Sequence, residues 1–386
     1  MQATGMIANP DWAYARNVLC IRLDNMGDVL MTTPAIRALR ASCGRRRITL
    51  MASTAGAQLA PYLPDVDDVL IHDAAWVKNG ARGHAGDCIA IERLRNRHFD
   101  AAVIFTVYSQ SALPAALMCH LAGIPRVLAH CRENPYRLLT HWVRDTEPQA
   151  GVRHEVQRQL DLVASVGMAC ANTRLSFQTR NRDRASMRRV LQGQGIDATH
   201  GWIVMHCGAT AQSRRYGAAG FSQTLGLLGD SGRIVLMTGN ASERQMVDNI
   251  IDAGRLDGTC VNLAGKLRLG ELGCVIEDAD LLISNNTGPV HIAAAVQTPV
   301  VDLYALTNPQ HTPWQVRHRL LFCDVPCKYC YRSVCPHGHN ACLNGVAPET
   351  VARAAYEILA HGGTVTQAAL PYVNGDGGEH HAYPGN

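Results

Sequence analysis

The first residues that could do chemistry lie in the segment Arg22-Leu-Asp-Asn-Met-Gly-Asp-Val29, which follows a short apolar run. Gly27 permits a tight turn, and Asp28 then falls at or next to the start of the helix that follows. A carboxylate at this place either caps the helix or accepts a proton from a bound hydroxyl group. The segment has neither a GxGxxG fingerprint nor a Walker GxxxxGK(S/T) motif, which argues against hydride transfer and ATP hydrolysis.

Two further segments favour an anionic ligand. Residues 206–216 (HCGATAQSRRY) combine a glycine, small hydroxyl residues and two arginines, which suit a phosphate group, although such a basic loop is often only exposed. Residues 283–295 (ISNNTGPVHIAAA) lead from a strand into an alanine-rich helix, where free backbone N–H groups near Thr287 and Gly288 could bind a diphosphate. His291 projects from the same side of that helix as Thr287, so it either binds the ligand or is structural.

The cysteines form a third group with possible chemistry. The chain has fourteen, and without an export signal they are expected to be thiols or metal ligands rather than disulfides. Five crowd between residues 323 and 342, and four of these follow the pattern C-x2-C-x4-C-x6-C: Cys327, Cys330, Cys335 and Cys342. Four thiolates at these spacings could close a tetrahedral structural zinc or iron site. The alternative is a set of unligated thiols in a C-terminal loop.

Apolar runs that alternate with amphipathic segments must position these residues. The first half predicts strands at 18–23, 48–52, 69–72 and 101–105, helices at 29–41, 89–97 and 152–166, and a glycine-rich loop at 78–87. The second half predicts strands at 202–206, 233–237, 261–263, 281–284 and 298–304. This alternation indicates an α/β protein with two Rossmann-like parallel-sheet domains facing a cleft. The expected domains are 1–175 and 176–362, followed by a disordered tail at 363–386.

Length and composition limit the class of protein. With 386 residues, of which 47% are hydrophobic and 18% charged, the chain can bury two cores and is not typical of disordered or disulfide-scaffold proteins. No apolar run reaches the roughly 20 residues of a membrane span, and no leader-like segment opens the chain, so we expect a cytoplasmic protein. The net charge of +4 is too small to favour nucleic acid. Its surplus lies in the first 175 residues, where Arg45, Arg46 and Arg47 form either a solvated face or a surface for an anionic acceptor or membrane.

Together these segments resemble glycosyltransferase family 9, the ADP-heptose:lipopolysaccharide heptosyltransferases and their relatives. The resemblance runs from about residue 18 to residue 361. It includes RLDNMGDVLMTTPA at 22–35, which is similar to the family's G-D-(V/I)-L…T-P-A signature. Further matching pieces, in order, are FDAAVI at 99–104, LAGIPR at 121–126, TGNASER at 238–244, LAGK at 263–266, LGEL at 269–272 and the segment 284–295.

The resemblance implies a GT-B fold, with the acceptor bound mainly by the first domain and the nucleotide sugar by the second. It also implies inversion at the anomeric carbon and no cofactor for catalysis, which agrees with the lack of a metal-binding motif at the predicted ligand edge. Asp28 matches the family's catalytic base. The donor-binding positions of the family match Thr210 and Arg214 for phosphate, Glu243 for the nucleoside, and Asn286, Thr287, Gly288 and His291 for the diphosphate and sugar.

Two positions depart from the family pattern. Arg214 stands where the family often has lysine, which keeps the charge and changes the geometry. Asn286 stands where the family usually has aspartate, which keeps hydrogen bonding and loses a charge, so the donor sugar and full activity are open.

The expected reaction moves a heptose from ADP-heptose to a lipopolysaccharide core, or a related glycan, at the inner face of the inner membrane. One alternative is a transfer within the same family that uses another nucleotide sugar or a protein acceptor. The other is a catalytically weak assembly protein that binds sugar nucleotides. The sequence does not indicate an oligomeric state.

Overall fold

Two six-stranded parallel sheets organise the chain. The computed structural model describes residues 10–77, 84–197, 201–254 and 259–360. The first sheet has the order β3-β2-β1-β4-β5-β6 and the second has the order β12-β11-β10-β7-β8-β9. In each sheet the chain first forms a central strand, then the strands out to one edge, and then the strands from the centre to the other edge. This is the doubly wound arrangement of Rossmann-like domains. The predicted α/β class with two parallel sheets is therefore confirmed.

The strands are short and mostly buried on both faces, as expected for parallel sheets covered by helices. Those of the first sheet are β1 (Asn17–Arg22), β2 (Arg47–Ala52), β3 (Asp68–Ile71), β4 (Ala101–Ile104), β5 (Val127–Cys131) and β6 (His141–Arg144). Those of the second are β7 (Trp202–His206), β8 (Ile234–Thr238), β9 (Cys260–Asn262), β10 (Leu281–Asn285), β11 (Val300–Leu303) and β12 (His318–Leu321).

Helices connect the strands and cover both sheets. In the first half they are α1 (Pro10–Ala13), α2 (Met26–Ser42), α3 (Thr54–Ala57), α4 (His84–Arg95), α5 (Leu113–Leu121) and α6 (Glu155–Ala164). In the second half they are α7 (Asn181–Gln192), α8 (Ala218–Leu227), α9 (Arg244–Gly254), α10 (Leu269–Glu277), α11 (Gly288–Val296), α12 (Ala341–Asn344) and α13 (Pro348–Ala360). None of the described helices is long and apolar enough to cross a bilayer.

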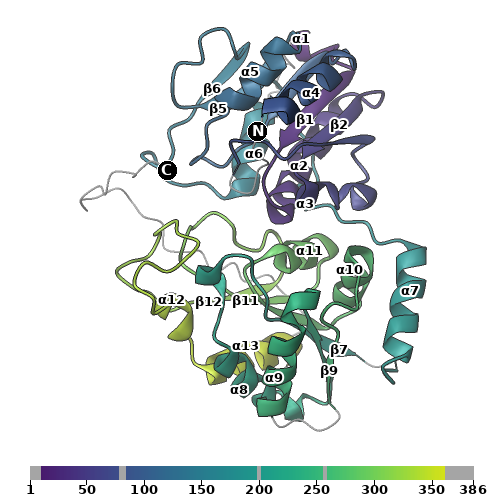
Figure 1. Cartoon of the computed structure of the whole chain (residues 1–386), viewed down its shortest axis with the longest axis vertical. Helices are drawn as coiled ribbons and strands as arrows, with labels where there is room; N and C mark the ends of the chain where they lie inside the picture. The colour runs from purple at the N-terminus through teal and green to yellow at the C-terminus, as the bar shows by residue number, and fades with distance from the viewer. Residues whose placement is uncertain (1–9, 78–83, 198–200, 255–258, 361–386) are drawn as a thin grey trace, which may run out of the picture.

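The two halves meet through the helices α2 and α11, which lie between the sheets (Figure 1). A single cluster of buried apolar side chains includes Val29 and Leu39 of α2 together with Ile292 and Ala293 of α11. Because both helices follow the central strands of their sheets, this contact brings the carboxyl ends of β1 and β10 toward each other. The fold thereby places the two most informative sequence segments at one interface.

Most predicted strands agree with the structure to within two residues, but several predictions need correction. The strands β5, β6 and β12 were not predicted. The predicted loop at 78–87 is wrong at its end, because α4 begins at His84, and residues 78–83 lie outside the described residues. Arg46 is wholly buried and donates to the backbone oxygens of Ala15 and Leu39, so the three consecutive arginines do not form one surface cluster. The expected tail at 363–386 also lies outside the described residues, and the domain limits stay a prediction.

Candidate active site

The candidate site lies where the amino ends of α2 and α11 meet. Gly27 is in the first turn of α2, and a Cβ atom added there would lie 2.8 Å from Cδ2 of His291 on α11. Only a residue without a side chain fits this close approach. The adjacent Asp28 therefore lies beside the proposed donor motif, although 262 residues lie between it and His291 in the sequence.

Asp28 caps α2, and its role as the proton acceptor stays a prediction. Its Oδ2 accepts a hydrogen bond from the backbone N–H of Asn25 at 3.2 Å, which caps α2. Its Oδ1 accepts from Nη2 of Arg22 at 3.3 Å. The side chain is still 14% exposed. Asp28 is thus held at two atoms and keeps an accessible edge from which it could accept a proton.

Arg22, at the end of β1, is shared among three carboxyl groups. Besides Asp28, its guanidinium pairs with Asp24 through Nε at 2.9 Å and with Glu155 through Nη1 at 2.7 Å. Burial alone would lower the pKa of Arg22, but Glu155, Asp24 and Asp28 raise it above its usual value. Burial raises the pKa of Asp24, and the charge of Arg22 opposes this. Arg22 therefore remains a cation that fixes the position of Asp28.

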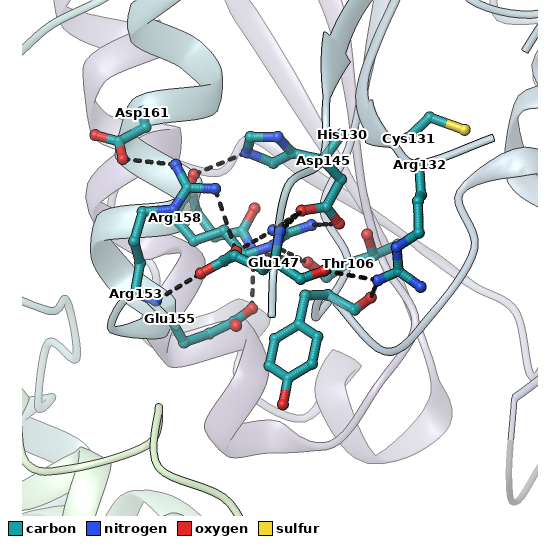
Figure 2. A network of polar contacts seen from close by, with 12 residues as sticks. Thr106, His130, Cys131, Arg132, Asp145, Glu147, Arg153, Glu155, Arg158 and Asp161 are labelled. Carbon is teal, nitrogen blue, oxygen red and sulfur yellow. Dashed lines mark hydrogen bonds and ion pairs between the residues drawn. The ribbon is translucent and has the colours of Figure 1, made fainter. Parts of the chain in front are cut away.

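Glu155 belongs to a buried polar network (Figure 2). Its Oε1 accepts a hydrogen bond from Nη1 of Arg22, so the network also supports Arg22. Nε2 of Gln159 donates to Oε1 of Glu155 at 2.7 Å and to the backbone oxygen of Thr106 at 3.0 Å. The same Thr106 oxygen accepts from Nε of Arg158 at 3.1 Å. Both Nη atoms of Arg158 lie 2.9 Å from the carboxylate of Asp145. These buried groups are joined by hydrogen bonds and support the candidate base, although Oε2 of Glu155 and Oε1 of Gln159 have no partner among the described residues.

On the opposite side, α11 offers an open amino end. Thr287 is the N-cap residue, but its side chain makes no capping bond and its Oγ1 donates to the backbone oxygen of Asn285 at 3.2 Å. Gly288 follows, and Pro289 lacks an N–H group. His291 is 4% exposed, and its Nδ1 has no hydrogen-bond partner among the described residues. Burial, with lesser effects of His154 and Arg214, lowers the pKa of His291 to about 3, so its ring is neutral.

The other expected donor residues lie on loops at the carboxyl ends of β7 and β8. Arg214 ends the short turn η2 (Gln212–Arg214), is half-buried, and donates from Nη2 to Oδ1 of Asn308 at 3.4 Å. Thr210 lies two residues before this turn and is exposed. Glu243 ends the turn η4 (Ala241–Glu243), and its carboxylate lies against Gly208 and Gly239. These positions suit the expected contacts with phosphate and nucleoside, which stay predictions.

The observed contacts of the Asn286 side chain are with other residues of the protein. Its side chain is buried, and Nδ2 donates to Oδ2 of Asp302 at 2.8 Å and to the backbone oxygen of His311 at 3.0 Å. Burial raises the pKa of Asp302 to about 8, although the hydrogen bond from Asn286 and the charge of Arg214 act in the opposite direction. The donor contact expected of Asn286 stays a prediction, whereas its structural role toward the His311 loop is observed.

Four residues of this site were missed by the sequence reasoning: Arg22, Glu155, Asp302 and His311. Two of them carried a usable signal. Asp302 is an acidic residue inside the apolar run of β11, which in a buried strand is unusual enough to indicate a function. His311 follows the carboxyl end of β11, the edge where ligands are expected in such sheets.

A cavity of about 300 Å³ opens beside Asp24 in the first half. Its lining includes Leu23, Trp76 and Phe105, together with the polar side chains of Asp24 and Gln110, which are hydrogen-bonded to each other. Asp24, which shares Arg22 with Asp28, connects the cavity lining to the carboxyl groups around the candidate base. The cavity is large enough for a sugar ring and is on the half expected to hold the acceptor.

The cysteine-rich segment runs from the end of β12 into α12. Burial raises the pKa of Cys342, and Cys330, Cys327 and Cys335 raise it further. Burial alone would raise the pKa of Cys335, but backbone N–H groups of residues 337–340 lower it below its usual value. Among the described residues, no three His, Cys, Asp or Glu side chains are arranged to hold a metal ion. A structural metal here stays a prediction.

Comparisons with known proteins agree with this arrangement. Residues 90–341 match the model of glycosyltransferase family 9 (heptosyltransferase). Lipopolysaccharide heptosyltransferase 3 of Escherichia coli K12 is 25% identical over 292 residues, which are 75% of this chain and 82% of that protein.

Solved structures show the same fold. E. coli ADP-heptose lps heptosyltransferase II matches with a TM-score of 0.70 and 20% identity, covering 89% of this chain and 98% of that one. The iron-containing dodecameric glycosyltransferase TibC from enterotoxigenic E. coli H10407 matches with a TM-score of 0.51 and 13% identity, covering 89% and 76%. The two sheets thus have the GT-B arrangement of these enzymes. From the match over 90–341, the chain belongs to glycosyltransferase family 9, the heptosyltransferases.

Proposed function

We propose that this glycosyltransferase moves a heptose from ADP-heptose to a lipopolysaccharide core, or a related glycan, with inversion and without a catalytic metal. The observation that carries the proposal is the placement of Asp28, held by Arg22, beside the open amino end of α11. An acceptor hydroxyl at Asp28 and a diphosphate at α11 would then meet at one anomeric carbon. The relatives named above, two of them lipopolysaccharide heptosyltransferases, support this substrate class.

The residues divide the chemistry between the two halves. Asp28 takes the proton of the acceptor hydroxyl while the hydroxyl oxygen forms a bond to the anomeric carbon. The bond between that carbon and the ADP oxygen breaks on the opposite face. The stereochemistry inverts because entry and departure are on opposite faces. Arg214 and the N–H groups at the start of α11 stabilise the charge on the departing ADP. Thr210, Thr287, Gly288, Asn286 and His291 orient the diphosphate and sugar, and Glu243 contacts the nucleoside.

The remaining expectations follow from this reaction. We assign acceptor binding to residues 1–175, with the cavity beside Asp24 as its entrance, and donor binding to residues 176–362. The acceptor would be reached from the cytoplasm at the surface of the inner membrane, and nucleic acid is not a partner.

The cysteine-rich segment has a separate role. Cys327, Cys330, Cys335 and Cys342 supply a set of four thiols of the kind that binds zinc or iron. The metal would stabilise the loop and take no part in transfer. The iron content of TibC supports this assignment.

A thermal-shift titration with ADP-heptose beside ADP, UDP- and GDP-sugars tests the donor. A ligand at ~100 times its dissociation constant should stabilise the fold by roughly 2.7 kcal/mol. A shift specific to ADP-heptose supports the proposal, and a shift with UDP- or GDP-sugars instead shows a different donor within the family.

Asp28→Asn tests the base. Transfer should fall about 10²–10⁴-fold, while donor affinity stays nearly unchanged because the amide keeps the shape of the side chain. Asp252→Asn, at an exposed position of α9, is the control. Wild-type turnover in Asp28→Asn, or an equal loss of donor affinity, would exclude this role. Donor binding by the unaltered chain without transfer to any acceptor would instead favour a sugar-nucleotide-binding assembly protein.

A further inference from the structure

The catalytic aspartate faces a histidine from the other half of the molecule. His311 lies in the loop between β11 and β12 and is 7% exposed. Its Nε2 lies 4.0 Å from Oδ1 of Asp28. This nitrogen is buried and has no hydrogen-bond partner among the described residues. A buried polar atom without a partner is costly, so its position beside Asp28 calls for a ligand that satisfies it.

The backbone of His311 is fixed from both halves. Its N–H donates to Oη of Tyr304 at 3.3 Å, and its carbonyl oxygen accepts from Nδ2 of Asn286 at 3.0 Å. The preceding carbonyl, of Gln310, accepts from the backbone N–H of Glu155 at 3.0 Å. Glu155 is also the partner of Arg22, which holds Asp28. The same elements therefore position the histidine and the aspartate relative to each other.

The neighbouring Asn308 sets which ring nitrogen of His311 carries the proton. Oδ1 of Asn308 faces two donors, Nη2 of Arg214 at 3.4 Å and Oγ1 of Thr307 at 3.1 Å. Its Nδ2 consequently faces Nδ1 of His311, at 2.9 Å. An amide NH₂ group only donates, so Nδ1 must accept and the proton of the neutral ring is on Nε2. The N–H bond is thus on the side of Asp28.

The His311 ring is neutral. Burial, followed by the charge of Arg214 and smaller effects of His291, Arg22 and His154, holds the pKa of His311 well below its usual value. Its contact with Asp28 is therefore not an ion pair. Nε2–H is a neutral donor and Oδ1 of Asp28 is an acceptor, with a gap between them.

One oxygen atom, to one side of the line that joins Nε2 of His311 and Oδ1 of Asp28, could bridge their separation of 4.0 Å. An oxygen placed about 2.8 Å from each of the two atoms, an ordinary length for such hydrogen bonds, would subtend an angle of about 90° across a separation of 4.0 Å. That oxygen could accept from Nε2–H and donate to Oδ1. A hydroxyl group has this combination of one acceptor and one donor function.

We propose that His311 is a second catalytic residue, whose Nε2–H binds the oxygen of the acceptor hydroxyl while Asp28 accepts its proton. The proposal rests on the glycosyl transfer proposed above and defines how the acceptor is held. His311 keeps its own proton throughout. Its hydrogen bond directs the remaining lone pair of the oxygen toward the anomeric carbon, and Asp28 takes the proton as the new bond forms.

Two substitutions separate this role from a structural one. His311→Ala removes the donor, whereas His311→Gln supplies an amide Nε2–H at a similar distance from the backbone. We expect kcat/KM for the acceptor to fall about 10²-fold in His311→Ala and to stay within a few-fold of wild type in His311→Gln. Donor affinity, measured by calorimetry, should be unchanged in both. His120→Ala, at an exposed position of α5, is the control.

A measurement on the resting protein is independent of activity. In ¹⁵N-histidine-labelled protein, the His311 signals, assigned by their loss in His311→Gln, should show Nε2 protonated and Nδ1 unprotonated. An Nδ1–H tautomer, an unimpaired His311→Ala, or a His311→Gln as impaired as His311→Ala would each overturn the proposal. In those cases an active wild-type chain leaves the proposed function standing, whereas a chain that transfers no sugar at all refutes that function and this role together.

Discussion

The carboxyl group of Asp302 should make the stability of the protein depend on pH. The residue is wholly buried in β11, where Oδ2 accepts from Asn286 and Oδ1 has no hydrogen-bond partner among the described residues. Burial raises its pKa from 3.8 to about 8. Between these values the folded chain holds a proton that the unfolded chain releases. The free energy of unfolding therefore falls as the pH rises through this window, because the unfolded state binds fewer protons than the folded state.

The magnitude follows from the same shift. Each pH unit inside the window changes the contribution of Asp302 by about 1.4 kcal/mol, so the step from pH 5 to pH 7 costs about 3 kcal/mol. Asp302→Asn keeps the shape and the acceptor oxygen for Asn286 but cannot ionise. The variant should therefore gain about 3 kcal/mol over wild type between pH 5 and pH 7.

Urea unfolding followed by circular dichroism at pH 5, 6, 7 and 8 measures this difference. All other titrating groups are common to the two proteins, so their effects cancel in the comparison. Asp252→Asn, which removes an exposed carboxylate, should differ from wild type by a nearly constant amount. A constant difference for Asp302→Asn as well would show that Asp302 titrates near its usual value, and would refute the reasoning from burial.

Two further predictions concern the interface and the cysteines. Gly27→Ala should lower transfer about 10²-fold because its Cβ meets the buried ring of His291, whereas Gly44→Ala, with open space at its Cβ, should behave as wild type in the same assay. Metal analysis of the purified protein should find about one zinc or iron per chain, lost in Cys335→Ser and kept in Cys88→Ser, which removes an exposed thiol of α4; a metal-free wild-type chain would rule out the site.

The parts of the fold with strong local patterns were predictable from the sequence. The strands β1 and β7 are almost uninterrupted apolar runs, as parallel strands covered on both faces must be. The edge strand β6 alternates between partly exposed and exposed residues, with Trp142 43% exposed, so it has no such run. The four-residue strand β12 begins with His318 and Arg319, and nothing in its local pattern marks it as a strand.

The same distinction applies to the site. Asp28 and the start of α11 were predictable because a strand, a glycine or polar turn and a helix follow one another in the chain. The approach of His311 to Asp28 was not, because it depends on the path of a loop in one half and on the packing of α2 against α11. The contact between Asn286 and Asp302 likewise requires the pairing of β10 with β11, which a single sequence does not give.

The two sides of the candidate site differ in charge. At the end of β1, one guanidinium serves three carboxyl groups, so this wall of the site is short of positive charge. The opposite wall carries Arg214 and the positive end of α11. In the proposed reaction, the first wall would repel a diphosphate and the second would attract it, so a nucleotide sugar would be favoured in the orientation that places its sugar toward Asp28. If the proposed function holds, the electric field of the protein would favour the reactive orientation of the donor independently of the acceptor.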